Sequence, residues 1–175
     1  MDIRFVPPEL SRLDDASAEL CACGIWSDER PVRGFAGLID WRLAGRLSAT
    51  LRSGFVTGQR GETLLIPGKP YLPFEKVLVF GLGPKTSFLE ERDDAFRAGI
   101  LHVARALEGL RVRRAVIELP GRASNLVDPK AAITLTLECV GDSAEHDVWW
   151  LVEEPPAQKL IEERAADERR RTRTV

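Results

Sequence analysis

The stretch VLVFGLGPKTS, from Val77 to Ser87, joins a run of β-branched and aromatic residues to a glycine-rich turn. An uninterrupted apolar run of this kind is typical of a strand that is buried on both faces. Gly81 and Gly83 allow the chain to turn sharply, and Ser87 with Glu90 has the Ser-x-x-Glu spacing of a helix capping box. The stretch therefore predicts a central strand that leads directly into a helix.

The same glycines raise the question of a phosphate-binding loop. A dinucleotide fingerprint requires a glycine where this chain has Thr86. A P-loop requires a glycine where Pro84 stands, and proline also removes a backbone N–H. The residues favour a structural turn. An anion site at the helix N-terminus stays open as the alternative, with Gly81, Gly83, Lys85, Thr86 and Ser87 as its candidate residues.

Strand-like and helix-like segments alternate along the chain. Strands are expected at 3–6, 18–26, 62–68, 76–80, 113–121 and 147–154. One helix is expected to begin at Asp40 as N-cap and to stop at Gly54, and another is expected from Ser87 to Leu110. The segment 128–141 fits both a strand and a helix, and its Asp-Pro start favours the helix. This alternation predicts an α/β sheet sandwiched between helices.

Length and composition indicate an ordinary soluble protein. A chain of 175 residues with 44% hydrophobic residues and a net charge of −2 is the size of one domain and is not committed to nucleic acid or a membrane. We expect a domain over 1–154 and a charged, solvated helix or tail over 155–175. No secretory signal and no apolar run near the ~20 residues that span a bilayer is visible, so a cytoplasmic location is expected.

The sequence contains no recognisable catalytic or metal-binding constellation. His102 and His146 lack partners at ligand spacing, and the three cysteines form neither a disulfide framework nor a zinc pattern. No nucleophile-elbow motif is present, and neighbouring acidic residues would diverge on a helix. We therefore expect no catalytic residue, no metal and no cofactor.

Two surface features suggest contacts. Trp149 and Trp150 are adjacent in an expected strand, so one ring lies on each face, and the ring outside the core would lie under a helix or at a partner interface. The C-terminal segment carries Arg169, Arg170, Arg171 and Arg173, which could hold nucleic-acid phosphates. Nearby acids offset this charge, and no aromatic residue is interleaved for base stacking.

The order of these segments resembles the N-terminal domain of the cytosolic leucine aminopeptidase family. The resemblance covers Glu19 to about Glu154, and it rests on FAGLIDWRLAGRLSATLRSGFVTGQRGETLLIPG (35–68), KVLVFGLGPKTSF (76–88) and RDDAFRAGILHVARALEGLRVRRAVIELP (92–120). It implies a macro-domain-like, three-layer α/β/α sandwich with a mixed, mostly parallel sheet. Members of this family carry two metals, a lysine and an Asn-Thr-Asp-Ala-Glu-Gly-Arg motif in a second, larger domain. The only asparagine here is Asn125, so no catalytic residue is transferred.

The resemblance implies a role in contacts and not in chemistry. In the family this domain shapes hexamers and, in some bacterial members, contributes to DNA binding. We therefore expect a non-catalytic, stand-alone homologue that oligomerises or docks on a protein partner. The alternatives are a macro-like module for a nucleotide or ADP-ribose-type ligand, a nucleic-acid binder, and an accessory chain of a metallopeptidase whose catalytic chain is separate. The chain lacks the asparagine-containing ribose motif of macro domains, which argues against ADP-ribose.

Overall fold

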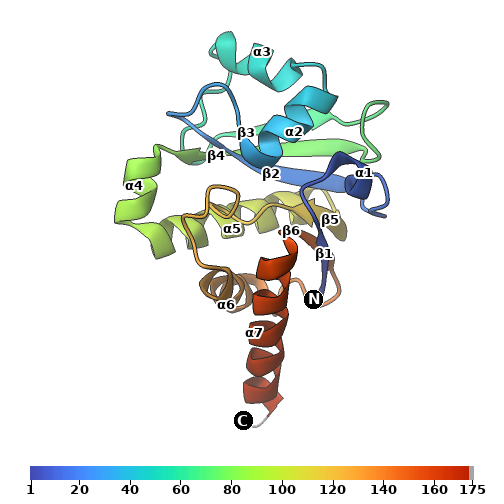
Figure 1. Ribbon diagram of the computed structural model, residues 1–175, viewed down its shortest axis with the longest axis vertical. Coiled ribbons are helices and arrows are strands. Elements are labelled where there is room, and N and C mark those ends of the chain that lie inside the picture. The colour runs from blue at the N-terminus through green and yellow to red at the C-terminus, as the bar shows by residue number, and fades with distance from the viewer. Residues whose placement is uncertain (174–175) are drawn as a thin grey trace.

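The computed structural model describes residues 1–173, and the side chains of Arg169 and of residues 171–173 lie outside the described part. Its sheet is six-stranded, in the order β1-β6-β5-β2-β4-β3 (Figure 1). The strands are β1 (Asp2–Val6), β2 (Leu20–Trp26), β3 (Thr63–Pro67), β4 (Lys76–Gly83), β5 (Arg114–Ile117) and β6 (Val148–Val152). The helices are α1 (Leu10–Leu13), α2 (Gly34–Arg42), α3 (Arg46–Arg52), α4 (Lys85–Glu90), α5 (Arg92–Gly109), α6 (Pro129–Val140) and α7 (Pro155–Arg173).

All neighbouring strands pair in parallel except β3, which is antiparallel to β4 at one end of the sheet. The strands β2 and β4 are apolar along nearly their whole length, because helices cover both of their faces. One buried cluster joins the sheet to α5, α6 and α7, and a second joins it to α1, α2 and α3. This arrangement confirms the predicted three-layer sandwich with a mixed, mostly parallel sheet.

The helix expected from Asp40 to Gly54 is two helices, α2 and α3. Ala44 and Gly45 adopt positive φ angles of 55° and 79°, which breaks the chain direction between them. Asp40 is buried inside α2 and does not begin a helix. Its carboxylate instead accepts hydrogen bonds from the backbone N–H and the hydroxyl of Ser48, at 3.1 and 2.5 Å, and so caps the first turn of α3.

The predicted capping box at Ser87 is also wrong. The first helix after β4 begins at Lys85, so Ser87 lies within α4, and the long helix α5 begins separately at Arg92. The N–H of Lys85 is instead satisfied by the carboxylate of Asp28, at 3.0 Å. The apolar spacing in α5 was predicted correctly: its core-facing side chains are Phe96, Ile100, Val103 and Leu107.

The ambiguous segment 128–141 is the helix α6, and Asp128 caps it as predicted by accepting from the N–H groups of Lys130 and Ala131. The last segment also forms a helix, α7, which extends away from the sheet (Figure 1). A fully solvated helix or tail was expected here, and that is wrong for Ile161 and Ala165, which are 0% and 6% exposed in the same buried cluster as residues of α6. Within residues 1–173, no helix has the length and apolar character needed to cross a membrane.

Candidate functional site

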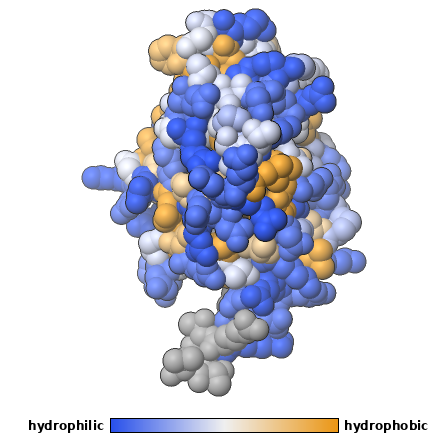
Figure 2. Space-filling model, turned by 90° about the vertical axis from the view of Figure 1, so that its left-hand side faces the viewer, coloured by the Kyte–Doolittle hydropathy of each residue, from blue (hydrophilic) through white to orange (hydrophobic). Residues whose placement is uncertain are grey.

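The parallel strands β2, β4, β5 and β6 all end at the same edge of the sheet, where open α/β sheets place their ligand sites. Two cavities of about 240 and 960 Å³ lie there and share Gly34, Glu118 and Ala123 in their walls. We call the joined cavities the carboxyl-edge cleft. Figure 2 views the molecule from the side of α4, which follows β4, and shows apolar patches set among mainly hydrophilic groups.

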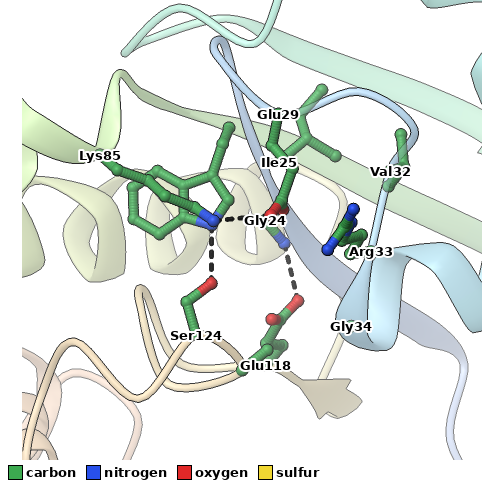
Figure 3. A pocket seen from close by; sticks show the side chains of 11 residues that line it. Gly24, Ile25, Glu29, Val32, Arg33, Gly34, Lys85, Glu118 and Ser124 are labelled. Carbon is green, nitrogen blue, oxygen red and sulfur yellow. Dashed lines mark hydrogen bonds and ion pairs between the residues drawn. The ribbon is translucent and has the colours of Figure 1, made fainter.

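The smaller cavity is framed by charged and aromatic side chains (Figure 3). On one side, Lys85 pairs with Glu29 at 2.6 Å and lies 5.8 Å from the ring centre of Trp26. The Trp26 indole N–H donates to the hydroxyl of Ser124 at 2.9 Å, which fixes the ring against the loop after β5. Arg33 lies on the opposite side, just before α2. Its guanidinium forms no hydrogen bond or ion pair with any described residue.

Glu118 lies directly after β5 and reaches both cavities. Its side chain is buried, at 5% exposure, and its Oε2 accepts the backbone N–H of Gly24 at 3.0 Å. Burial raises the pKa of Glu118 to about 8, with smaller contributions from the charges of Glu153 and Glu29, while the Gly24 N–H opposes the shift. Glu118 is therefore a neutral carboxylic acid near pH 7, and it forms no ion pair within the described part of the chain.

The larger cavity has apolar walls over a charged floor. Its apolar lining comes from α2, from the loop before α6 and from α7: Phe35, Leu38, Leu126, Val127, Ala157 and Leu160. The floor holds Arg122, which contacts both carboxylate oxygens of Glu153 at 2.7 and 2.8 Å and donates to the carbonyl of Val127 at 2.5 Å. Arg122 and Glu153 are only 6% and 5% exposed, so this ion pair is a buried, bidentate one.

Of the residues proposed from the sequence for an anion loop, Lys85 lines the cleft, whereas Gly81, Gly83, Thr86 and Ser87 are absent from the walls of both cavities. Gly81 has another function. A Cβ atom there would lie 1.9 Å from the carbonyl oxygen of Gln59, so the glycine permits close contact between β4 and the loop before β3. Gly83 donates its N–H to Gly58 and holds φ at 78°, which favours glycine.

The candidate contact residues lie elsewhere. Trp149 and Trp150 do point to opposite faces, and they are 1% and 9% exposed. The guanidinium of Arg4 lies 5.1 Å from the ring centre of Trp150. In the C-terminal arginine segment, Arg170 approaches Asp167 at 3.9 Å, and the side chains of Arg169, Arg171 and Arg173 lie outside the described residues.

Other reactive groups form no second site. In the described part of the chain, no cluster of three or more His, Cys, Asp or Glu residues could hold a metal ion. Burial raises the pKa of the Cys21 and Cys23 thiols well above the ordinary value, so both stay protonated. His102 contacts the hydroxyl of Thr63 through Nε2.

The sequence interpretation missed the central residues of the cleft, Glu118 and Arg122. One signal was present: in AVIELPGR, Glu118 interrupts a buried apolar run at the point where a strand ends. A charged side chain at that position is placed at the ligand-binding edge of a parallel sheet.

The family model described as "Cytosol aminopeptidase family, N-terminal domain" matches residues 23–144. The chain belongs to this family. A probable cytosol aminopeptidase of Acidithiobacillus ferrooxidans is 35% identical over 111 residues, which are 63% of this chain and 22% of that protein. The chain thus spans about a fifth of the length of this relative, and its match corresponds to the N-terminal domain.

Solved structures agree with the fold. A tomato leucine aminopeptidase mutant superposes with a TM-score of 0.60 at 15% identity, over 93% of this chain and 35% of that one. A Trypanosoma brucei macrodomain in complex with ADP-ribose gives a TM-score of 0.68 at 16% identity, over 92% of this chain and 67% of that one. The cytosol aminopeptidase N-terminal domain is therefore macrodomain-like in this chain.

Proposed function

We propose that this cytosol aminopeptidase N-terminal domain acts by binding and not by catalysis, and that the carboxyl-edge cleft is its small-molecule site. The observation that carries the proposal is Glu118, a buried carboxyl without a charged partner that opens into a cleft. Buried polar groups are normally satisfied by the protein, and a group left open at a cavity is available to a ligand.

The size of the cleft supports the same proposal. Ligand sites in proteins usually measure about 300–1,000 Å³, with mainly apolar walls and a few converging polar groups. The larger cavity alone measures about 960 Å³, and its walls have this composition. Catalysis finds no comparable support, because the described residues hold no cluster that could bind a metal ion, and the Thr63–His102 contact lies outside both cavities.

A substitution at Ala123 tests the cleft directly. Ala123 is exposed and lies where the cavities join, so Ala123→Phe fills the cleft without altering the core. Ala166→Phe, at an exposed position on α7, is the matched control. Binding would be measured by calorimetry with a panel of amino acids, dipeptides and adenine nucleotides. The panel includes ADP-ribose, because the macrodomain neighbour is described in complex with it.

We expect at least one compound of the panel to bind the wild-type chain. Ala123→Phe should weaken that binding by roughly tenfold or more, whereas Ala166→Phe should leave it unchanged. Binding that is equal in all three proteins would place the site outside the cleft. An absence of binding across the panel would contradict the proposal.

A second candidate function is association with another copy of this chain, which is one of the two contact roles that the sequence interpretation favoured. It is supported by Trp41 in α2 and Phe55 after α3, which are 73% and 76% exposed, because exposed aromatic side chains are enriched at protein interfaces. Light scattering of the wild-type chain should then show a dimer or larger species. The double substitution Trp41→Ser and Phe55→Ser should give a monomer, and a wild-type monomer at high concentration would contradict this candidate.

A further inference from the structure

The charges around Glu118 indicate which kind of ligand group would bind in the smaller cavity. The acids nearest to it already have cationic partners: Glu29 pairs with Lys85, and Glu153 pairs with Arg122. Glu118 has only the Gly24 N–H on Oε2. No fully buried side-chain oxygen among the described residues lacks a hydrogen-bond partner, so the free Oε1 keeps contact with the cavity that it lines.

A ligand ammonium group would complete this arrangement. A buried carboxylate is stable when a cation is held against it, and Lys85 and Arg122 are already engaged by other acids. An ammonium group has three donors and can reach an oxygen in a small space. A second negative group at this position would instead be opposed by Glu29, Glu153 and Glu118 itself.

A second wall of the same cavity offers the opposite charge. Arg33 lines it and pairs with no described acid. The helix α2 begins at the next residue, Gly34, with no side-chain cap, so the N–H groups of its first turn add positive potential on this side. A guanidinium group binds a carboxylate in a bidentate manner. The cavity is therefore lined by both a carboxyl group, from Glu118, and a cation, from Arg33.

We propose, building on the cleft as a binding site, that the smaller cavity holds the zwitterionic head group of an α-amino acid, with its ammonium on Glu118 and its carboxylate on Arg33. The volume of about 240 Å³ suits a head group, and the adjoining cavity of about 960 Å³ is lined by Phe35, Leu38 and Leu126. The side chain of the amino acid would enter that larger cavity, so large apolar amino acids are preferred.

Calorimetry with L-phenylalanine and its truncated analogues tests the head group. L-Phenylalaninamide lacks the carboxylate, and 3-phenylpropionate lacks the amine. We expect L-phenylalanine to bind and each analogue to bind at least roughly tenfold more weakly, since each loses a charge-assisted hydrogen bond. Equal affinity for all three compounds would overturn the zwitterion assignment.

Proton release gives a second readout that a merely structural Glu118 would not produce. Glu118 is protonated in the free protein near pH 7, so an arriving ammonium should displace its proton. Binding heats in buffers of different ionisation enthalpy should show close to one proton released per L-phenylalanine in the wild type, and none in Glu118→Gln. Release of no proton by the wild-type chain would contradict the pairing with Glu118.

Matched variants separate this inference from the proposed function. Glu118→Gln and Arg33→Gln should each weaken L-phenylalanine roughly tenfold or more, and Arg52→Gln, at an exposed position on α3, should not. If L-phenylalanine does not bind while another compound of the panel binds and is lost in Ala123→Phe, the zwitterion assignment fails and the cleft stands. If nothing binds the wild-type chain, both proposals fail.

Discussion

The strands β4 and β5 flank β2, and the connections that follow them form opposite sides of the carboxyl-edge cleft. The first connection comprises the end of β4 and the turn after it, from Gly81 to Lys85, and has the glycine-rich sequence of a ligand loop. The connection after β5, from Glu118 to Asp128, has no such motif. The polar group that is open to a ligand nevertheless lies in the connection after β5, and not in the glycine-rich one.

The first connection is satisfied by the chain itself. The Lys85 N–H is accepted by Asp28 and the Lys85 ammonium by Glu29, so neither group is free for a ligand. In the second connection, Glu118 has one oxygen bonded and no cationic partner among the described residues. Glycines allow backbone segments to approach closely, whereas a buried polar group with an unused hydrogen-bonding atom is available to a ligand.

The largest expected effect concerns the buried pair of the second connection. Arg122→Met leaves Glu153 buried without its cation, so the free energy of unfolding should fall by about 3–5 kcal/mol. The double substitution Arg122→Met and Glu153→Leu removes both charges and should recover much of that loss. Denaturant unfolding measures both proteins, and a loss below about 1 kcal/mol for Arg122→Met would show that the pair does not hold this connection.

The glycines of the first connection should matter for stability and not for binding. Gly81→Ala places a methyl group 1.9 Å from the Gln59 carbonyl oxygen, so the loop before β3 must move and the free energy of unfolding should fall by about 3 kcal/mol. Gly109→Ala, at the end of α5 with no atom near the added methyl, should instead be neutral or stabilise by up to ~1 kcal/mol. A Gly81→Ala protein that is stable yet loses ligand affinity would restore the ligand-loop interpretation.

Much of the fold follows from local sequence. Each expected strand is present, because continuous apolar runs such as β2 and β4 have no other stable place than a covered sheet. The errors at Asp40 and Ser87 have a common cause. At both positions a residue with helix-capping chemistry was assigned to the nearest helix start, whereas the observed caps reach across space, from Asp40 to Ser48 and from Asp28 to Lys85.

The cleft was harder to predict than the fold. The strand end at Glu118 could have indicated its location, but its charge state depends on burial and on Glu29 and Glu153, which come from distant parts of the sequence. The pairing of Arg122 with Glu153 joins residues 31 positions apart. Tertiary packing therefore decides which acids are paired and which one is left for a ligand.

A third prediction uses the pH dependence of stability. The pKa of Glu118 is about 8 in the folded chain against an ordinary value of 4.5, so between these values the folded state holds a proton that the unfolded state releases. The contribution of Glu118 to the free energy of unfolding is therefore complete below pH 4.5 and is lost as the pH rises through 8. Relative to Glu118→Gln, the wild type should lose about 2 kcal/mol between pH 6 and pH 7.5.

Glu9→Gln, at an exposed position before α1, is the control for that measurement. Its difference from the wild type should stay constant over the same pH range. If the difference between the wild type and Glu118→Gln also stays constant, Glu118 is already ionised at pH 6. Glu118 would then not differ in charge from the paired acids Glu29 and Glu153, and the proposed difference between the two connections would fail.

The smallest effect concerns the acid that completes the first connection. Asp28→Ala removes the acceptor of the Lys85 N–H at the start of α4, and the free energy of unfolding should fall by about 1 kcal/mol, as for other lost helix caps. Asp28→Asn keeps an oxygen acceptor and should lose less. Neither substitution removes a wall residue of the cleft, so affinity for a cleft ligand should be retained in both.

Unchanged stability in Asp28→Ala would mean that the Lys85 N–H is satisfied equally well by solvent. The connection after β4 would then be as open to an external anion as its glycines suggest.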